Sequence, residues 1–169
     1  MRNTTLCYIR NRQGQTLLLH RIKKENDLNR DKWIGVGGKF EDKESPEECL
    51  LREVREETGL TLTHYRYRGI VTFVSDRWET EYMHLFTADG FTGTLCECRE
   101  GVLEWVDDAT MARLPTWEGD RLFLELLRQD APFFSLKLEY AGDTLLAAAL
   151  NGRPLDKKEG CPPPENAVE

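Results

Sequence analysis

The sequence lacks any apolar run long enough to cross a membrane. Its longest runs, residues 17–19 and 145–150, are far shorter than the about 20 apolar residues that a spanning helix needs. The first residues, Met1 to Thr5, lead into a strand-like segment and lack the apolar core of a secretion signal. We therefore expect a cytoplasmic protein without membrane partners.

The cysteines provide no disulfide framework. There are five of them, an odd number, and their spacing matches no small disulfide-rich scaffold. Cys96 and Cys98 lie two apart, but a metal clip would need a second such pair, and none exists in the sequence. Reduced thiols in a reducing compartment are the expectation.

An excess of positive charge is also missing. The net charge is −7, which argues against binding to a nucleic acid polymer or to an anionic membrane surface. If the substrate is a polyphosphate, an acidic protein must recruit cations to hold it.

The sequence does contain a mixture of predicted strands and two predicted helices. Strand-like patterns occupy residues 4–10, 16–22, 65–74, 82–88, 102–106, 136–140 and 144–150. Helical patterns occupy residues 45–58 and 117–129, and the charged segment 23–32 reads as a mobile loop. We expect one domain over residues 1–150, with a mixed sheet covered by helices, and a flexible tail over residues 151–169.

The start and the end of the first helix are well marked. Ser45 is a suitable N-cap, Pro46 suits the first helical position, and Glu48 completes a capping box. Gly59 stands where the helix should stop. Just upstream, residues 35–38 include three glycines, which allow the main chain to approach a bound group closely.

Three carboxylates fall on one side of this helix. Glu53, Glu56 and Glu57 are separated by three and four positions, so they lie within one arc of the helical wheel. Their mutual repulsion calls for a cation, and a hard ion such as Mg²⁺ prefers oxygen ligands. Gly38 could add a main-chain carbonyl. The alternative is an exposed helix whose glutamates are solvated or paired with nearby arginines.

The acidic segment is part of a longer pattern. The pattern reads Gly38-x5-Glu44-x7-Arg52-Glu53-Val54-x-Glu56-Glu57-x-Gly59-Leu60. In these residues the chain resembles the Nudix (MutT-like) hydrolase family, whose full signature this is. The resemblance implies an α/β fold, a Nudix-type α/β/α sandwich around a mixed β-sheet. It also implies metal-dependent pyrophosphohydrolase activity, with Mg²⁺ as the cofactor and Mn²⁺ as a possible substitute.

The resemblance implies a role for each matched position. Metal ions would be bound at the positions held here by Gly38, Glu53, Glu56 and Glu57. Arg52 would orient the helix carboxylates, Glu44 would form a salt bridge within the motif, and Gly59 would form the turn after the helix.

Phosphoryl chemistry adds further candidates. Bound Mg²⁺ would polarise phosphoryl oxygens and acidify a water molecule. Glu56 is the first candidate to accept the proton of that water and Glu100 is the second, and Glu100 is also a candidate metal ligand. Lys23 and Lys39 are candidates to contact the outer phosphates, although loop lysines are usually only solvated.

Segments outside the motif narrow the resemblance. Residues 33–39, Glu100, residues 103–106 and residues 115–120 resemble the Nudix subgroup that hydrolyses oxidised purine nucleoside triphosphates, notably 8-oxo-dGTP. The bacterial, MutX-like members are the most similar, and the likeness extends over residues 4–150. It implies a small-molecule nucleotide substrate, with the nucleoside monophosphate and pyrophosphate as products, and a role in cleansing the nucleotide pool that protects DNA.

The candidate base-binding residues follow from the chemistry of guanine. Asp120 could accept the two donors on the pairing edge of guanine, and Trp117 could stack on the base, a contact worth about 1–3 kcal/mol. Phe73 could close the pocket. Alternatively, Asp120 only favours the positive end of its helix and Trp117 belongs to the core. The mammalian member of the subgroup has an asparagine at the position of Ile34 and a second aspartate at that of Gly119, and these departures leave base selectivity open.

Two other functions stay open at this point. One is a broader nucleotide or nucleotide-sugar pyrophosphatase, and the other is a nucleotide-sensing module without catalysis. A missing motif glutamate would favour the sensing module, and here all of them are present. The sequence leaves both a monomer and a homodimer possible.

Overall fold

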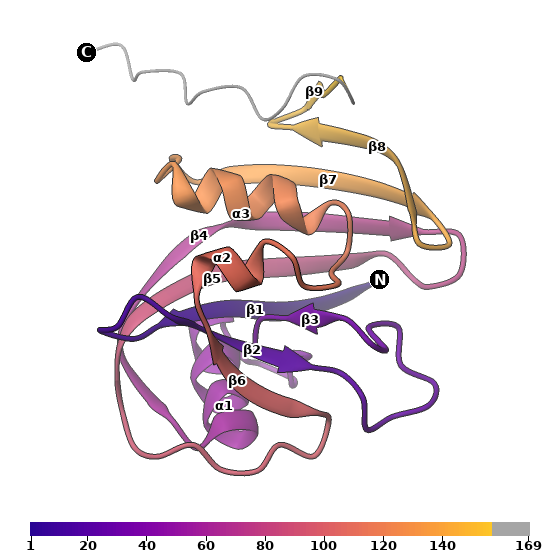
Figure 1. The fold of residues 1–169 in the computed structure, drawn as a ribbon. Helices are drawn as coiled ribbons and strands as arrows, with labels where there is room; N and C mark the ends of the chain where they lie inside the picture. Colours follow the sequence, from indigo (N-terminus) through magenta and orange to yellow (C-terminus); the bar gives the residue numbers. More distant parts are fainter. Residues whose placement is uncertain (157–169) are drawn as a thin grey trace, which may run out of the picture.

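In the computed structural model, which describes residues 1–156, one nine-stranded sheet runs through the molecule (Figure 1). Its strands are β1 (Arg2–Arg10), β2 (Thr16–His20), β3 (Trp33–Ile34), β4 (Thr61–Ser75), β5 (Glu81–Thr92), β6 (Val102–Val106), β7 (Phe134–Ala141), β8 (Thr144–Leu150) and β9 (Arg153–Pro154). The strand order is β3-β2-β1-β5-β4-β7-β8-β9, and β6 also pairs with β2. The β1–β5 and β4–β7 pairs are parallel and the others are antiparallel, so the sheet is mixed.

Three helices accompany this sheet: α1 (Pro46–Thr58), α2 (Asp108–Met111) and α3 (Asp120–Arg128). Leu50 and Val54 of α1 belong to the hydrophobic core on one face of the sheet. Phe123 and Leu126 of α3 belong to a second core on the other face. The predicted α/β/α sandwich with a mixed sheet is therefore confirmed. In residues 1–156, no helix is both long and apolar enough to span a bilayer.

Helix α1 begins and ends as its sequence predicts. The Ser45 hydroxyl accepts from the Glu48 N–H at 3.2 Å, and the Glu48 carboxylate accepts from the Ser45 N–H at 2.7 Å. A capping pair of this kind stabilises a helix by about 1 kcal/mol. At the other end Gly59 has φ 79°, a left-handed conformation that glycine adopts without strain. These caps fix the first residue of α1, and with it the direction in which each motif glutamate points.

Several boundaries differ from the prediction. The second helix begins at Asp120 rather than at Trp117, and the second strand ends at His20 rather than at residue 22. The short elements β3, α2 and β9 were not predicted, because two to four residues give no measurable periodicity.

The segment between β2 and β3 is held by local hydrogen bonds. Asp31 donates its N–H to the Arg21 carbonyl at 2.8 Å, and Asn29 donates its N–H to the Asp27 carboxylate at 3.0 Å. At the other end of the chain, residues 151 and 152 form the turn that leads into β9. The rest of the predicted tail, residues 157–169, lies outside the described part of the chain.

Candidate active site

A cavity of about 570 Å³, here called the main cavity, collects most of the predicted site residues. It is lined by predicted residues from both halves of the expected site: Gly38, Lys39, Glu53, Glu57, Phe73, Glu100, Trp117 and Asp120. Ile34 also lines it. The acidic helix and the candidate base-binding residues, which are far apart in the sequence, therefore face the same space.

Glu57 and Glu100 lie next to each other at the acidic end of this cavity. The Glu57 carboxylate accepts from the Gly37 N–H at 3.0 Å, and burial, reinforced by the charge of Glu100, raises its pKa. The Glu100 carboxylate is bound by Lys24 at 2.7 Å and by Arg21. Burial opposes ionisation of Glu100, but these two cations outweigh it and lower the Glu100 pKa. Glu100 therefore has two cationic hydrogen-bond partners, whereas Glu57 accepts a hydrogen bond from a neutral backbone N–H.

Glu53 packs directly against the glycine loop. A Cβ atom added to Gly38 would lie 2.3 Å from the Glu53 carboxyl carbon, so a larger residue there would displace the Glu53 carboxylate. The Gly38 carbonyl accepts from the Thr5 N–H at 2.8 Å and faces the Cys49 thiol at 3.6 Å. Burial raises the pKa of Glu53, although its contact with Arg52 opposes the rise. The carboxylate is held close to the loop that also holds Glu57.

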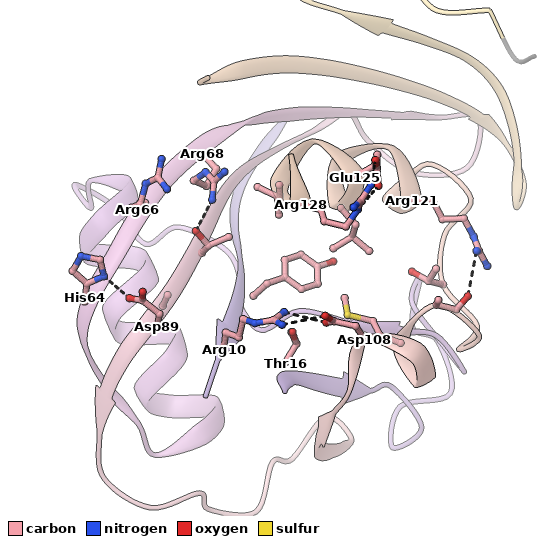
Figure 2. A pocket seen from close by; sticks show the side chains of 18 residues that line it. Arg10, Thr16, His64, Arg66, Arg68, Asp89, Asp108, Arg121, Glu125 and Arg128 are labelled. Carbon is pink, nitrogen blue, oxygen red and sulfur yellow. Dashed lines mark hydrogen bonds and ion pairs between the residues drawn. The ribbon is translucent and has the colours of Figure 1, made fainter. Parts of the chain in front are cut away.

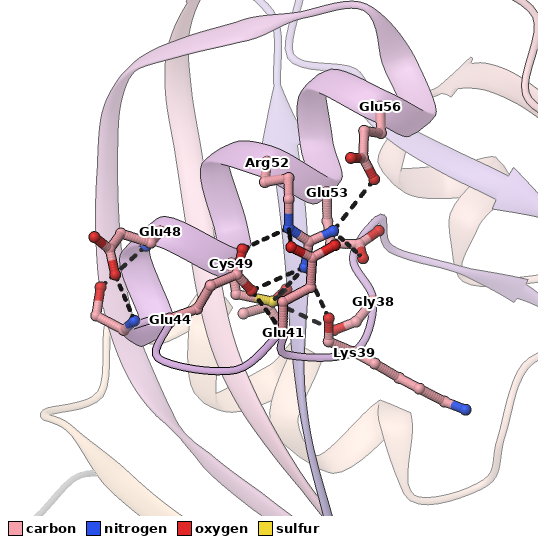
Figure 3. A network of polar contacts seen from close by, with 11 residues as sticks. Gly38, Lys39, Glu41, Glu44, Glu48, Cys49, Arg52, Glu53 and Glu56 are labelled. Atoms are coloured by element: carbon pink, nitrogen blue, oxygen red, sulfur yellow. Dashed lines mark hydrogen bonds and ion pairs between the residues drawn. The ribbon is translucent and has the colours of Figure 1, made fainter.

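Arg52 connects the carboxylates of the motif (Figure 3). It donates to both oxygens of Glu44, at 2.5 and 2.9 Å, and to the Lys39 carbonyl at 2.9 Å. It also donates to Glu53 at 2.8 Å and to Glu56 at 3.2 Å. The hydrogen bonds to Glu44 are the largest cause of the raised Arg52 pKa. The guanidinium thus holds Lys39 and Glu44 of the loop to Glu53 and Glu56 of the helix.

Glu56 and Lys23 lie outside the lining of the main cavity. The Glu56 side chain is 60% exposed and is bound by Arg52. The Lys23 ammonium donates to the Cys98 carbonyl at 2.7 Å, which directs it to the loop before β6. Lys39 is therefore the predicted lysine that faces the cavity.

The donor set of the acidic end suits a divalent cation. Within residues 1–156 no three His, Cys, Asp or Glu side chains converge, as they lie, into a metal-binding group. Glu53, Glu57 and Glu100 nevertheless supply only oxygen ligands around one end of the cavity, which is the chemistry that Mg²⁺ prefers. Burial raises the pKa of both Glu53 and Glu57, so a cation between them would relieve an unfavourable arrangement.

The opposite end of the cavity holds the buried carboxyl group of Asp120. Asp120 is 5% exposed and accepts a hydrogen bond from the Thr116 hydroxyl at 2.9 Å. Burial raises its pKa to about 7, against the opposing effects of Thr116 and of the Lys32 charge. A carboxyl group in this position can accept hydrogen bonds from a polar ligand that excludes water from it.

Aromatic side chains surround that carboxyl group. The Trp117 ring is 6% exposed and makes edge contacts with Phe73 and Tyr140, with ring centroids 5.2 and 5.0 Å apart. Its indole N–H donates to the Asn29 side chain at 2.7 Å, and the Lys32 ammonium lies 4.2 Å from its ring centroid. Trp117 is therefore both part of the core and part of the cavity wall.

Sequence reasoning did not identify the residues that hold these groups in place. Arg21 bridges Asp27 and Glu100, Asn29 fixes the Trp117 indole, and Thr116 binds Asp120. All three lie in irregular segments or at the end of a strand, where spacing carries no signal. The charged character of residues 21–32 was visible, but its partners were not.

An α/β/α sandwich with an acidic capped helix and a glycine loop beside one cavity defines the Nudix hydrolases as a class. The sequence pattern that describes this family, the NUDIX domain, matches residues 1–127. The chain therefore belongs to this family. It is a MutT-like Nudix hydrolase, which confirms the prediction made from the motif.

Individual relatives agree with this assignment. An uncharacterised Nudix hydrolase of Bacillus subtilis, YvcI, is 36% identical over 100 residues, which are 56% of this chain and 63% of the relative, so the chain spans less than two thirds of that protein. An oxidized purine nucleoside triphosphate hydrolase of Danio rerio is 33% identical over 65% of this chain and 71% of its own length. Among solved structures, the mutator MutT protein of Bacillus halodurans superposes with a TM-score of 0.79 at 27% identity, covering 91% of this chain and 100% of that one.

Proposed function

We propose that this hydrolase cleaves purine nucleoside triphosphates, with 8-oxo-dGTP as the preferred substrate, to the nucleoside monophosphate and pyrophosphate. The proposal includes Mg²⁺ as the cofactor and the cleansing of the nucleotide pool as the role. One observation carries it above the others. A single cavity has carboxylates suited to a metal ion at one end and a buried carboxyl group among aromatic rings at the other.

The volume and the charged lining of this cavity suit a nucleotide. Glu53 and Glu57 would hold the metal ions, and a bound metal ion would supply a Lewis acid for the phosphate chain and lower the pKa of a water molecule. Lys39 faces the same end and would contact a phosphate oxygen. Without cations, a triphosphate would be repelled by these carboxylates and by the net charge of −7.

The base would occupy the opposite end. Guanine presents two neighbouring N–H donors, and the Asp120 carboxylate has acceptor positions left beside its bond from Thr116. Phe73 and Trp117 supply flat apolar surface against which a purine can pack. The relatives named as oxidized purine nucleoside triphosphate hydrolases support this choice of substrate class.

Glu100 is better placed than Glu56 to accept the proton of the attacking water. A general base must lie within hydrogen-bond reach of the reacting atoms and be ionised at the working pH. Glu100 lines the cavity and its lowered pKa keeps it ionised, whereas Glu56 is 60% exposed and lies outside the lining of the cavity. We therefore assign the base to Glu100, which was the second candidate from the sequence, and give Glu56 to the network that Arg52 organises.

The broader-specificity alternative rests on Ile34. Its side chain lines the main cavity but has no polar atom with which to distinguish an oxidised base from a normal one. If other contacts do not discriminate, the enzyme would accept dGTP or a nucleotide sugar about equally well.

The test is product release from a panel of 8-oxo-dGTP, dGTP, dATP and ADP-ribose, with Mg²⁺ and with a chelator. We expect pyrophosphate and monophosphate from 8-oxo-dGTP, with the highest kcat/KM of the panel, and no turnover in chelator. Equal or better turnover of dGTP would reject the cleansing role, and preference for ADP-ribose would favour the alternative. No turnover of any substrate with Mg²⁺ or Mn²⁺ would favour a sensing module.

A further inference from the structure

A second cavity of about 540 Å³ lies on the α3 face of the sheet, and Figure 2 shows it from close by. Its walls come from α3, from α2 and its flanks, and from strands β1, β2, β4 and β5. Among the described residues, none that lines this space also lines the main cavity. Thr116 lines the second cavity, and its partner Asp120 lines the main one, so the two spaces are separated by this pair.

The inner surface of this second space is apolar. Tyr8 of the sheet lies on one side, and Leu124 and Leu127 of α3 lie on the other. Met111 of α2 closes a third side. Helix α3 is nine residues long and β4 is fifteen, so the helix leaves part of the sheet face without cover. The volume is within the range of small-molecule pockets.

Five arginines stand around the same space, and we call it the arginine-rimmed cavity. They are Arg10, Arg66, Arg68, Arg121 and Arg128. Two of them are neutralised nearby, because Arg10 binds both oxygens of Asp108 at 3.0 and 3.1 Å and Arg128 binds Glu125 at 2.5 and 2.8 Å. In a chain with a net charge of −7, this concentration of guanidinium groups stands out.

The other three arginines are less well compensated. Arg66 and Arg68 donate to the same oxygen of Asp130, at 2.9 and 3.0 Å, so two cations share one carboxylate. Arg121 donates to the Ala112 carbonyl at 3.3 Å and forms no ion pair within the described residues. Three carboxylates, Asp89, Asp108 and Glu125, also line this space, so guanidinium groups outnumber carboxylates there by five to three.

Arg68 differs from an ordinary surface arginine. Its side chain is 7% exposed, whereas that of Arg66 is 56% exposed. Burial and the neighbouring charge of Arg66 lower its pKa, with Asp130 opposing them. Exposed arginines are usually only solvated and contribute little. A buried guanidinium is costly unless it is well paired, and Arg68 has the Thr87 hydroxyl at 3.1 Å and a share of the Asp130 carboxylate at 3.0 Å.

We propose that the arginine-rimmed cavity binds a small organic anion with an apolar body. The anionic head, a phosphate ester or a carboxylate, would lie against Arg66 and Arg68, because guanidinium groups bind such planar or tetrahedral anions through paired N–H donors. The apolar body would fill the space between Tyr8 and Leu124. This site is independent of the proposed reaction in the main cavity.

The three methionines of the chain allow a direct test. Met111 lines the arginine-rimmed cavity, Met83 lines the main cavity, and Met1 is 82% exposed. Protein carrying ¹³C-methyl methionine would be titrated with 1-naphthyl phosphate, 1-naphthoate and uncharged 1-naphthol, and followed by NMR. We expect the Met111 methyl signal to shift and saturate with the two anions, at lower concentrations than are needed to shift Met83.

Two variants separate specific recognition from general attraction. Arg66→Gln should weaken binding of the tighter anion at Met111 at least tenfold, and Arg12→Gln, an equal change of charge in the exposed β1–β2 turn, should leave it unchanged. The tighter of the two anions identifies the preferred head group. The proposal is overturned if Met111 does not shift, if 1-naphthol binds as tightly as the anions, or if Arg66→Gln binds like the wild type.

Discussion

At one end of the main cavity two of the three carboxylates come from one short helix, whereas the other end is assembled from distant parts of the chain. Glu53 and Glu57 are four residues apart on α1, and Gly38 packs against Glu53 while the Gly37 N–H binds Glu57. Asp120, Trp117 and Phe73 come from α3, from the loop before it, and from β4. The first end is built by helical geometry and charge, and the second by packing in the core.

This difference indicates that the two ends have separate functions, one in the chemical step and the other in binding of the base. The acidic end has several mutually dependent charges, so a change there should affect the chemical step. The opposite end has the buried Asp120 carboxyl group among apolar rings, so a change there should affect binding of the base. The predictions below test this division, and the largest expected effect comes first.

Replacing Glu57 by glutamine should cause the largest loss. The substitution keeps the shape of the side chain but removes the charge that would hold a metal ion, so we expect kcat to fall by about a hundredfold or more. Steady-state kinetics with saturating Mg²⁺ measures this, and circular dichroism checks that α1 is intact. Glu97→Gln, an equal change at an exposed position, should have near-normal kcat. Near-normal turnover of Glu57→Gln would reject the metal assignment.

The helix carboxylates of the acidic end could be predicted from sequence because their geometry is local. Positions three and four apart on a capped helix must share a face, whatever the rest of the fold does. Periodicity predicted the strands, and the resemblance carried by the motif predicted the sandwich. The ends of elements were less accurate, as at Asp120, where the predicted helix began three residues too early.

The supporting contacts could not be predicted, because they are made between irregular segments. Nothing in the sequence shows that Asn29 meets Trp117, 88 positions away, or that Arg21 meets Glu100, 79 positions away. Such pairs depend on how loops return to the sheet. The arginine-rimmed cavity was missed for the same reason, since its arginines lie on several separate elements.

Replacing Gly38 by alanine should disturb the acidic end through sterics alone. The new methyl group would lie 2.3 Å from the Glu53 carboxyl carbon and would displace that carboxylate. We expect kcat to fall about tenfold or more, with KM for the base less affected. In the double variant with Glu53→Gln, the two losses should be far from additive, because both act on the same group. Additive losses would show that Gly38 acts elsewhere.

Replacing Asp120 by asparagine should act mainly on KM. The amide offers one acceptor and one donor where guanine needs two acceptors, so we expect KM for guanine nucleotides to rise about tenfold, by analogy with a lost buried hydrogen bond. KM for a nucleotide without those donors should change less. Asp42→Asn, at an exposed position, is the matched control. A large fall in kcat with all nucleotides would instead give Asp120 a structural or catalytic role.

Asp120 should also make binding depend on pH. Burial raises its pKa to about 7, so the group is neutral below that pH and ionised above it. Since the ionised form is the better acceptor for guanine, KM should fall as the pH rises through about 7 and then level off. In Asp120→Asn this step should be absent. A wild-type KM that is flat between pH 6 and 8 would contradict the role of the carboxylate in reading the base.

The smallest expected effect comes from Ile34, where this chain departs from the mammalian pattern. Ile34→Asn would place a donor and an acceptor in the cavity wall and should raise the ratio of kcat/KM for 8-oxo-dGTP over dGTP by about fivefold, the value of one neutral hydrogen bond. Ile34→Val, which adds no polar atom, should leave the ratio unchanged, and an equal shift in both variants would contradict the idea. The aspartate of the mammalian pattern cannot be introduced at Gly119 in the same way. A Cβ atom there would lie 2.6 Å from the Tyr140 hydroxyl, so in this chain added selectivity can enter through Ile34 but not through a second aspartate.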